Sequence, residues 1–118
     1  ALSNGNDFVY IHIEAPDECG HRNERDNKVK SIELIDEKIA GYLIQELGKQ
    51  SEDYRIMVLP DHPTPLSLRT HTSDLVPFLI YDSRMIKENP YNFDEDGAAI
   101  GGLFFQEGYK LMDYFIGE

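Results

Sequence analysis

The chain has few of the features that mark disulfide-linked, membrane-spanning or nucleic-acid-binding proteins. Its 118 residues include one cysteine, Cys19, which excludes an internal disulfide framework and is compatible with a reducing cytoplasm. No apolar run approaches the roughly 20 residues that a membrane-spanning helix needs. Lysine and arginine number 11 against 22 acidic residues, for a net charge of -11, whereas phosphate backbones attract basic surfaces. We therefore expect a cytoplasmic protein that binds neither membranes nor nucleic acid.

Length and composition predict one compact globular domain. Apolar residues make up 41% of the chain and charged residues 28%, a balance typical of folded soluble proteins rather than disordered ones. A length of 118 residues is too short for two domains of ordinary size. The sequence begins with Ala1 rather than methionine, and we expect a fragment or a processed product.

The pattern of apolar residues in the first half predicts a strand, a loop, a helix and a second strand. Residues 8–13 and 56–59 are continuous apolar runs, which are typical of buried strands. Residues 14–27 are polar and predict a long loop, with Asp26 or Asn27 capping the helix that follows. Apolar residues recur every three or four positions from 28 to 47, and Gly48 suits the helix end. Strand, helix and strand in this order predict a right-handed parallel crossover and an α/β fold.

The second half predicts fewer regular elements. A third strand is expected at residues 76–81, with its proline near the start, where one is tolerated. Residues 83–100 predict an irregular segment with a helical turn, and residues 103–105 a short extended piece. A closing helix is expected at 109–116.

Acidic and histidine side chains cluster at three points beside the expected strands. Asp17 and His21 follow the first strand, Asp61 and His62 follow the second, and His71 precedes the third. Ligands of open α/β sheets bind beyond the carboxyl ends of the strands, so all five side chains are expected at one rim. Carboxylate oxygens and neutral imidazole nitrogens are ligands of zinc, manganese and similar divalent ions. The pattern predicts a metal site.

Each cluster taken alone has a structural interpretation that stays open. An Asp-His pair after a strand is most often a surface turn, and loops are rich in both residues. His71 alone would more often be a loop or cap histidine. We interpret His12, within the first expected strand, as structural, and Cys19 as a small buried filler rather than a nucleophile.

The ordered motifs resemble those of a known family. The segment His12-Ile13-Glu14-Ala15-Pro16-Asp17-Glu18-Cys19-Gly20-His21, the pair Asp61-His62 and the segment His71-Thr72-Ser73-Asp74-Leu75-Val76-Pro77-Phe78 are similar to C-terminal motifs of cofactor-independent phosphoglycerate mutases. The archaeal-type branch of that family, within the alkaline phosphatase superfamily, fits best. The resemblance covers about residues 7–117. It implies that residues 1–118 are a single C-terminal portion of a metalloenzyme phosphotransferase domain, in which a parallel sheet is sandwiched between helices.

The resemblance also implies a site for two divalent ions, with manganese, zinc, cobalt or magnesium as candidates. Asp17, His21 and His71 would hold one ion, and Asp61 with His62 the other. The substrate would be a phosphorylated small molecule, because the family moves a phosphoryl group between the 3- and 2-hydroxyls of glycerate through a phosphoserine. Two further family positions, Lys30 and Glu33, are expected to have support roles.

The family's serine nucleophile has no counterpart in this chain. Ser3, Ser31 and Ser73 do not stand in a comparable motif, and in the family the nucleophile comes from an N-terminal segment. We expect no catalytic residue here, an inactive fragment, and self-association through strand edges cut from a larger sheet. Alternatives are a relative of the kinds labelled proposed homoserine kinase or phosphonopyruvate decarboxylase, a non-catalytic metal-binding module, or an α/β domain with incidental histidines.

Overall fold

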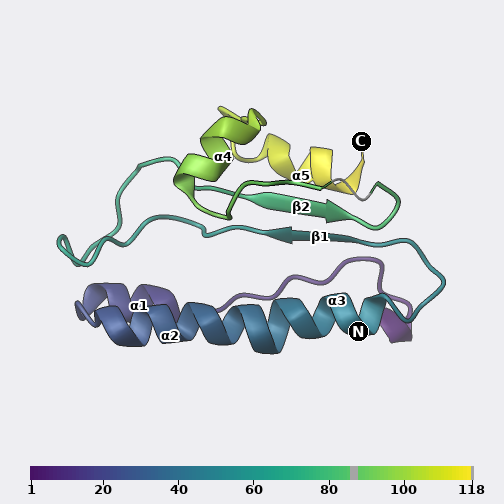
Figure 1. Ribbon diagram of the computed structural model, residues 1–118, viewed down its shortest axis with the longest axis horizontal. Coiled ribbons are helices and arrows are strands. Elements are labelled where there is room, and N and C mark those ends of the chain that lie inside the picture. The colour runs from purple at the N-terminus through teal and green to yellow at the C-terminus, as the bar shows by residue number, and fades with distance from the viewer. Residues whose placement is uncertain (86–87, 118) are drawn as a thin grey trace. The chain divides into compact units, whose positions relative to one another are not determined.

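The computed structural model describes residues 1–85 and 88–117 and contains helices and one small sheet (Figure 1). It divides into two compact units. The first comprises residues 1–41 and 64–70, and the second comprises residues 42–63 and 71–118. Each unit is described separately below. Among the described residues, no helix is long and apolar enough to cross a membrane.

The first unit is built on two packed helices, α1 and α2 (Figure 1). A short 3-10 helix, η1 (Leu2–Asn4), precedes them. Helix α1 spans Ala15–His21, where a long loop was expected, and α2 spans Arg25–Ile35. The loop prediction was wrong because the residues between the expected strand and helix suit a helix start. Pro16 lies in the first turn, where its missing N–H costs nothing, and Asp17 and Glu18 complement the positive end of the helix dipole.

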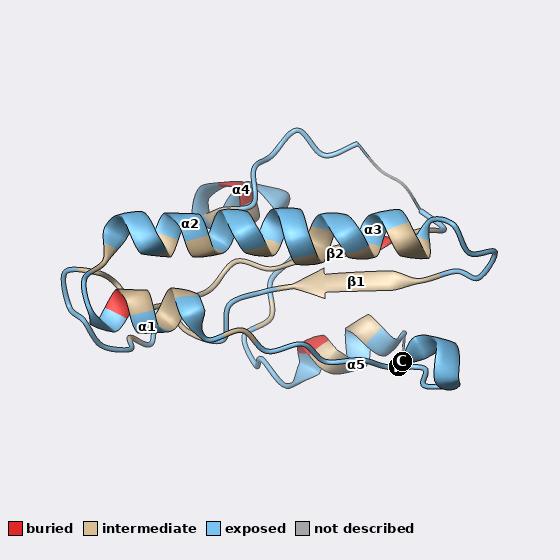
Figure 2. Ribbon diagram, turned by 90° about the horizontal axis from the view of Figure 1, so that it is seen from below, coloured by how far each residue is buried: buried red, intermediate tan, exposed pale blue. Residues whose placement is uncertain are grey.

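The helix predicted at 28–47 is confirmed as a continuous helical run with a different beginning. It starts at Arg25 with Glu24 as the N-terminal cap, so neither Asp26 nor Asn27 is the cap. The π-helical segment η2 (Asp36–Ala40) and α3 (Gly41–Leu47) continue α2, and the run ends before Gly48 as expected. Most residues of α2 are exposed, including Val29 and Ile32 of the predicted apolar face (Figure 2). The later members of that face are half-buried: Ile35, Ile39, Leu43 and Leu47.

The strand predicted at residues 8–13 is wrong for this structure. These residues form no regular element, and the apolar side chains from Phe8 to Ile11 are between 42% and 71% exposed. A strand needs a hydrogen-bonded neighbour, and the sheet in the described part of the chain has only the two strands β1 and β2. The parallel crossover expected from residues 8–13 is therefore absent from the described residues.

The second unit contains that sheet, formed by β1 (Arg55–Val58) and β2 (Leu79–Asp82). The strands are antiparallel, with Arg55 opposite Asp82 and Val58 opposite Leu79. The strand predicted at 56–59 is thus confirmed within one residue. The strand predicted at 76–81 begins three residues later, because its partner is only four residues long.

Helices α4 (Glu95–Gly101) and α5 (Lys110–Ile116) complete the second unit. Helix α5 confirms the predicted closing helix, and Leu111 on it is buried. Residues 103–105 form no regular element. Helix α4 lies in the segment predicted to be irregular with a helical turn, and residues 86 and 87 of that segment lie outside the described residues. Asp94 caps α4 by accepting a 2.7 Å hydrogen bond from the Gly97 amide. Aspartate is a favoured residue at this position, so the sequence itself indicates this helix start.

Hydrogen bonds of Arg55, which also binds the buried carboxylate of Asp82, connect α5 to the sheet. Asp82 is 8% exposed and accepts a 2.7 Å hydrogen bond from Nε of Arg55 across the strand pair. The same arginine donates a 2.8 Å hydrogen bond to the carbonyl of Phe115, near the end of α5. Arg84 adds two side-chain hydrogen bonds to Asp82, at 2.7 and 3.0 Å. These arginine hydrogen bonds, with Arg84 the larger cause, hold the pKa of Asp82 far below its usual range.

Candidate metal centre

Asp17 and His21 lie four residues apart on α1, so both side chains project from the same face of the helix. Oδ2 of Asp17 lies 3.3 Å from Nε2 of His21. The side chains are 34% and 41% exposed, respectively, and solvent can reach both. The structure places these two residues together on a helix rather than in a loop, and their role as metal ligands stays a prediction.

Segment 64–70 of the first unit forms hydrogen bonds with Asp17 and His21 through the side-chain atoms that do not face each other. The Thr64 hydroxyl donates a 2.5 Å hydrogen bond to Oδ1 of Asp17, and the Arg69 carbonyl lies 2.9 Å from Nδ1 of His21. Because a carbonyl only accepts, Nδ1 of His21 carries the proton. This arrangement leaves Oδ2 and Nε2 facing each other, where both atoms could bind one divalent ion.

Gly20 is required for the close approach of segment 64–70 to α1. A Cβ atom at Gly20 would lie 2.6 Å from the Thr64 carbonyl oxygen and 2.9 Å from its Cγ2 atom. Real Cβ atoms do not come this close to a backbone oxygen. The glycine between the two ligands of the Asp17-Glu18-Cys19-Gly20-His21 motif therefore leaves room for the residue that anchors Asp17.

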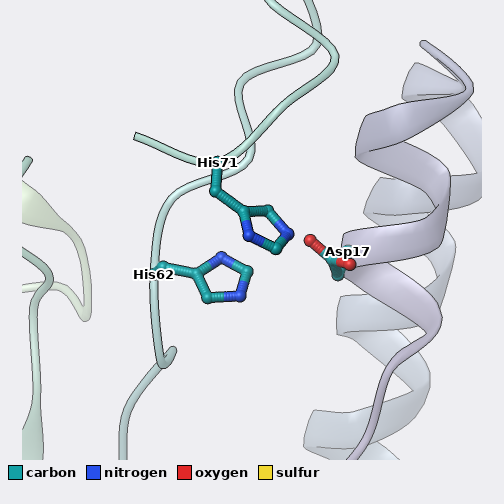
Figure 3. Close-up of side chains that lie close together, drawn as sticks. All are labelled: Asp17, His62 and His71. Carbon is teal, nitrogen blue, oxygen red and sulfur yellow. The ribbon is translucent and has the colours of Figure 1, made fainter. Parts of the chain in front are cut away.

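The second unit brings together His62 and His71. Figure 3 shows the two rings next to each other. Their centroids are 3.6 Å apart with an angle of 31° between the planes, and a ring nitrogen of each lies within 4.8 Å of the other. Two nitrogens held at about 2.0–2.1 Å by one zinc ion are separated by less than about 4.2 Å, and the ions of a two-metal site lie about 3.5–4 Å apart. Histidine nitrogens this close suit the ligands of one ion or of two neighbouring ions. The hydrogen bond from the Thr72 amide to the Pro63 carbonyl, at 3.1 Å, holds the two histidine-bearing segments together.

Asp61 and His62 point to the same side of the chain because the backbone bends at these two residues. Oδ2 of Asp61 lies 3.2 Å from Nε2 of His62, and Oδ1 accepts a 3.0 Å hydrogen bond from the His62 amide. The bend lies at Asp61 and His62 themselves, immediately before Pro63.

The sequence interpretation missed the residues that hold Asp17 and His21 in place. Thr64 is 5% exposed and lies between two prolines, and its position two residues after His62 was the only available signal. Lys28, on α2, donates a 2.8 Å hydrogen bond to the Thr64 carbonyl. The predicted support residues Lys30 and Glu33 are exposed on the same helix, and their roles remain predictions. Arg69 contributes its backbone carbonyl oxygen, and the identity of a side chain does not predict a contact made by the backbone.

Comparison with known proteins identifies relatives over nearly the whole chain. The sequence model of the metalloenzyme superfamily matches residues 1–112. The 2,3-bisphosphoglycerate-independent phosphoglycerate mutase of Methanothrix thermoacetophila is 44% identical over 110 residues, which cover 93% of this chain and 28% of the relative. The probable enzyme of the same name from Geobacter sulfurreducens is 40% identical over 112 residues, with the same coverage of both chains. That of Saccharolobus solfataricus is 38% identical over 99 residues, 83% of this chain and 23% of the relative. No solved structure matches the chain.

Proposed function

The chain belongs to the metalloenzyme superfamily, and from this membership we propose that it carries the metal-binding part of a cofactor-independent phosphoglycerate mutase. The chain spans about 28% of the length of the first relatives, so the proposal concerns the activity of a longer protein. That protein would interconvert 3- and 2-phosphoglycerate through a phosphoserine. The serine would come from outside these 118 residues, and the chain alone would be inactive.

The opposed atoms of Asp17 and His21 support the proposal most directly. A carboxylate oxygen and an imidazole nitrogen face each other at 3.3 Å, and their outer atoms are bonded to Thr64 and Arg69. Metal-binding histidines ordinarily donate their second N–H to a carbonyl or carboxylate in this way, which fixes the tautomer and aims the other nitrogen. The donor set suits zinc, manganese or cobalt better than it suits calcium.

We assign the five candidate ligands to two divalent ions, as the family motifs imply. Asp17, His21 and His71 would hold one ion, and Asp61 with His62 part of the shell of the other. His62 precedes Thr64 by two residues and His71 follows Arg69 by two, and two residues span at most about 7 Å. Both histidines are thus close along the chain to the segment whose Thr64 and Arg69 contact Asp17 and His21. Lys30 and Glu33 keep their proposed support roles.

Bound ions would stabilise negative charge on a transferring phosphoryl group and activate an oxygen nucleophile. The contribution of this chain is to hold the ligands. Thr64 and Arg69 orient Asp17 and His21, and the bend at Asp61 and His62 directs both side chains to one side. A phosphorylated small molecule would approach the ions rather than the protein surface, because the chain has a net charge of -11.

We propose that residues 1–118 form a single C-terminal portion of a parallel-sheet sandwich in the longer cytoplasmic protein. Residues 8–13 would occupy a strand position there, paired with segments outside this chain. Their exposed apolar side chains fit that role, since Phe8, Val9, Tyr10 and Ile11 are all exposed here. The isolated chain would then self-associate through the same surface.

Metal analysis of the longer protein tests the assignment. We expect about two divalent ions per molecule in the unsubstituted protein, and a His71→Ala variant should lose at least one of them. His12→Ala is the matched control, because His12 is a histidine that stands outside the ligand set. An unchanged metal content in His71→Ala would contradict the two-ion assignment. Transfer between 3- and 2-phosphoglycerate, measured on the same preparations, separates an enzyme from a non-catalytic metal-binding module.

A further inference from the structure

We propose that Thr64 and Lys28 are positioning residues that determine how tightly Asp17 and His21 hold a divalent ion. The inference rests on the proposed metal function, and it deepens that function by assigning two residues outside the ligand set. Both residues act through segment 64–70, which we call the strap. The strap bonds to α1 and α2 at three points, all within the first unit.

The Thr64 hydroxyl determines which oxygen of Asp17 faces His21. It donates to Oδ1 at 2.5 Å, so Oδ2 is left to face Nε2 of His21 at 3.3 Å. Hydrogen bonds to an ionised acceptor are about twice as strong as those between neutral groups. With Thr64 only 5% exposed, water competes poorly for that bond. Asp17 is therefore held in one orientation before an ion arrives.

Lys28 holds the strap by its backbone. Its Nζ atom donates to the Thr64 carbonyl at 2.8 Å, and the same carbonyl oxygen would lie 2.6 Å from a Cβ atom at Gly20. The Thr64 peptide is thus bonded to Lys28 on α2 and lies against Gly20 on α1. This contact fixes the backbone from which the Thr64 hydroxyl reaches Asp17.

The other end of the strap carries backbone strain where it meets His21. Arg69 has a φ of 54°, in the left-handed region that non-glycine residues rarely adopt. A turn closed by the 2.9 Å hydrogen bond from the Arg69 amide to the Pro65 carbonyl precedes it. Such strain persists where surrounding contacts impose it. Here the strained residue is also the one whose carbonyl accepts a hydrogen bond from His21. The strap therefore orients both ligands, Asp17 through Thr64 and His21 through Arg69.

Manganese titration of the intact chain tests the two positioning residues. Thr64→Val keeps the shape of the side chain but removes the hydroxyl, and we expect Mn²⁺ affinity to fall about 10- to 100-fold, the usual cost of losing a residue that orients a ligand. Thr64→Ser keeps the hydroxyl and should bind Mn²⁺ more tightly than Thr64→Val. Lys28→Met should weaken binding about tenfold. Lys38→Met is the matched control, since Lys38 is 68% exposed and pairs with Glu37.

The proton on His21 gives a second measurement that needs no metal. In the unsubstituted chain, nitrogen-detected NMR in mildly alkaline buffer should place the proton on Nδ1. In Lys28→Met we expect a mixture of tautomers, because the strap loses its hydrogen bond to α2 and holds the Arg69 carbonyl less firmly against the ring.

The two measurements separate the failure of this inference from the failure of the metal function. If the unsubstituted chain binds Mn²⁺ and Thr64→Val binds it equally well, the positioning role is wrong while the metal function stands. If the unsubstituted chain binds neither Mn²⁺ nor Zn²⁺, the metal function of the chain fails, and the NMR measurement decides the positioning role. An unchanged Nδ1 proton in Lys28→Met would then overturn it.

Discussion

The carbonyl oxygen of Thr64 lies 2.6 Å from the position that a Cβ atom would occupy at Gly20. Alanine is favoured over glycine inside a helix by about 1 kcal/mol, so a Gly20→Ala substitution would ordinarily stabilise α1. Here the added methyl group would push the strap away from Asp17. We expect Gly20→Ala to lower both the melting temperature and the Mn²⁺ affinity, measured by thermal unfolding with and without the ion.

Gly101 provides the matched control for that substitution. It lies at the end of α4, and nothing stands within 4 Å of a Cβ atom there. Gly101→Ala should leave the stability unchanged or raise it by up to about 1 kcal/mol. A Gly20→Ala variant that is as stable as Gly101→Ala and binds Mn²⁺ normally would contradict the packing argument.

The local pairs of the candidate site could be predicted from the sequence because they depend on short spacing. Asp17 and His21 are four residues apart and meet on one helix face, and Asp61 and His62 are adjacent. The helical run from 28 and the strand at 56–59 follow from residue periodicity and composition, which the chain itself contains.

What could not be predicted depends on partners distant in the sequence. Thr64 and Lys28 are 36 residues apart, and no local pattern links them. The strand predicted at 8–13 has the right composition, but strand formation depends on a neighbouring strand that the described residues do not supply. The loop assigned to 14–27 failed for another reason: its proline and glycine are compatible with a helix when proline lies in the first turn and glycine at a close contact.

Asp17 and His21 should couple metal binding to stability. An ion that binds only the folded chain stabilises it by about 2.7 kcal/mol at 100 times its dissociation constant. We expect added Mn²⁺ to raise the melting temperature and a chelator to reverse the increase. Asp17→Asn removes the ionised oxygen, so its melting temperature should respond little to Mn²⁺. His12→Ala should retain the full response, and an equal response in Asp17→Asn would exclude Asp17 as a ligand.

Asp82 should make stability depend on pH in the acid range. Hydrogen bonds from Arg84 and Arg55 lower its pKa in the folded state, so the unfolded chain takes up this proton first as pH falls. The stabilisation is therefore complete above the ordinary aspartate pKa of about 3.9 and is lost progressively below it, towards the lowered pKa of the folded state. Asp82→Asn should lower the free energy of unfolding at neutral pH, and the difference from the unsubstituted chain should shrink below about pH 4.

Denaturant unfolding between neutral pH and pH 2.5 would measure this effect. Asp113→Asn is a suitable control, because Asp113 is exposed on α5. A difference between Asp82→Asn and the unsubstituted chain that stays constant down to the lowest pH would show that the ionised carboxylate is not its source.

Tyr10 should contribute to self-association of the isolated chain. It is 71% exposed within the apolar stretch from Phe8 to Ile11, and exposed apolar segments without a strand partner promote association between chains. We expect Tyr10→Lys to shift sedimentation towards the monomer at a given concentration. Tyr109→Lys is matched in exposure, at 72%, but Tyr109 stands between Gly108 and Lys110 and donates a hydrogen bond to Glu107. Equal association of the two variants would mean that chains associate through another surface, and a monomer at every concentration would refute self-association altogether.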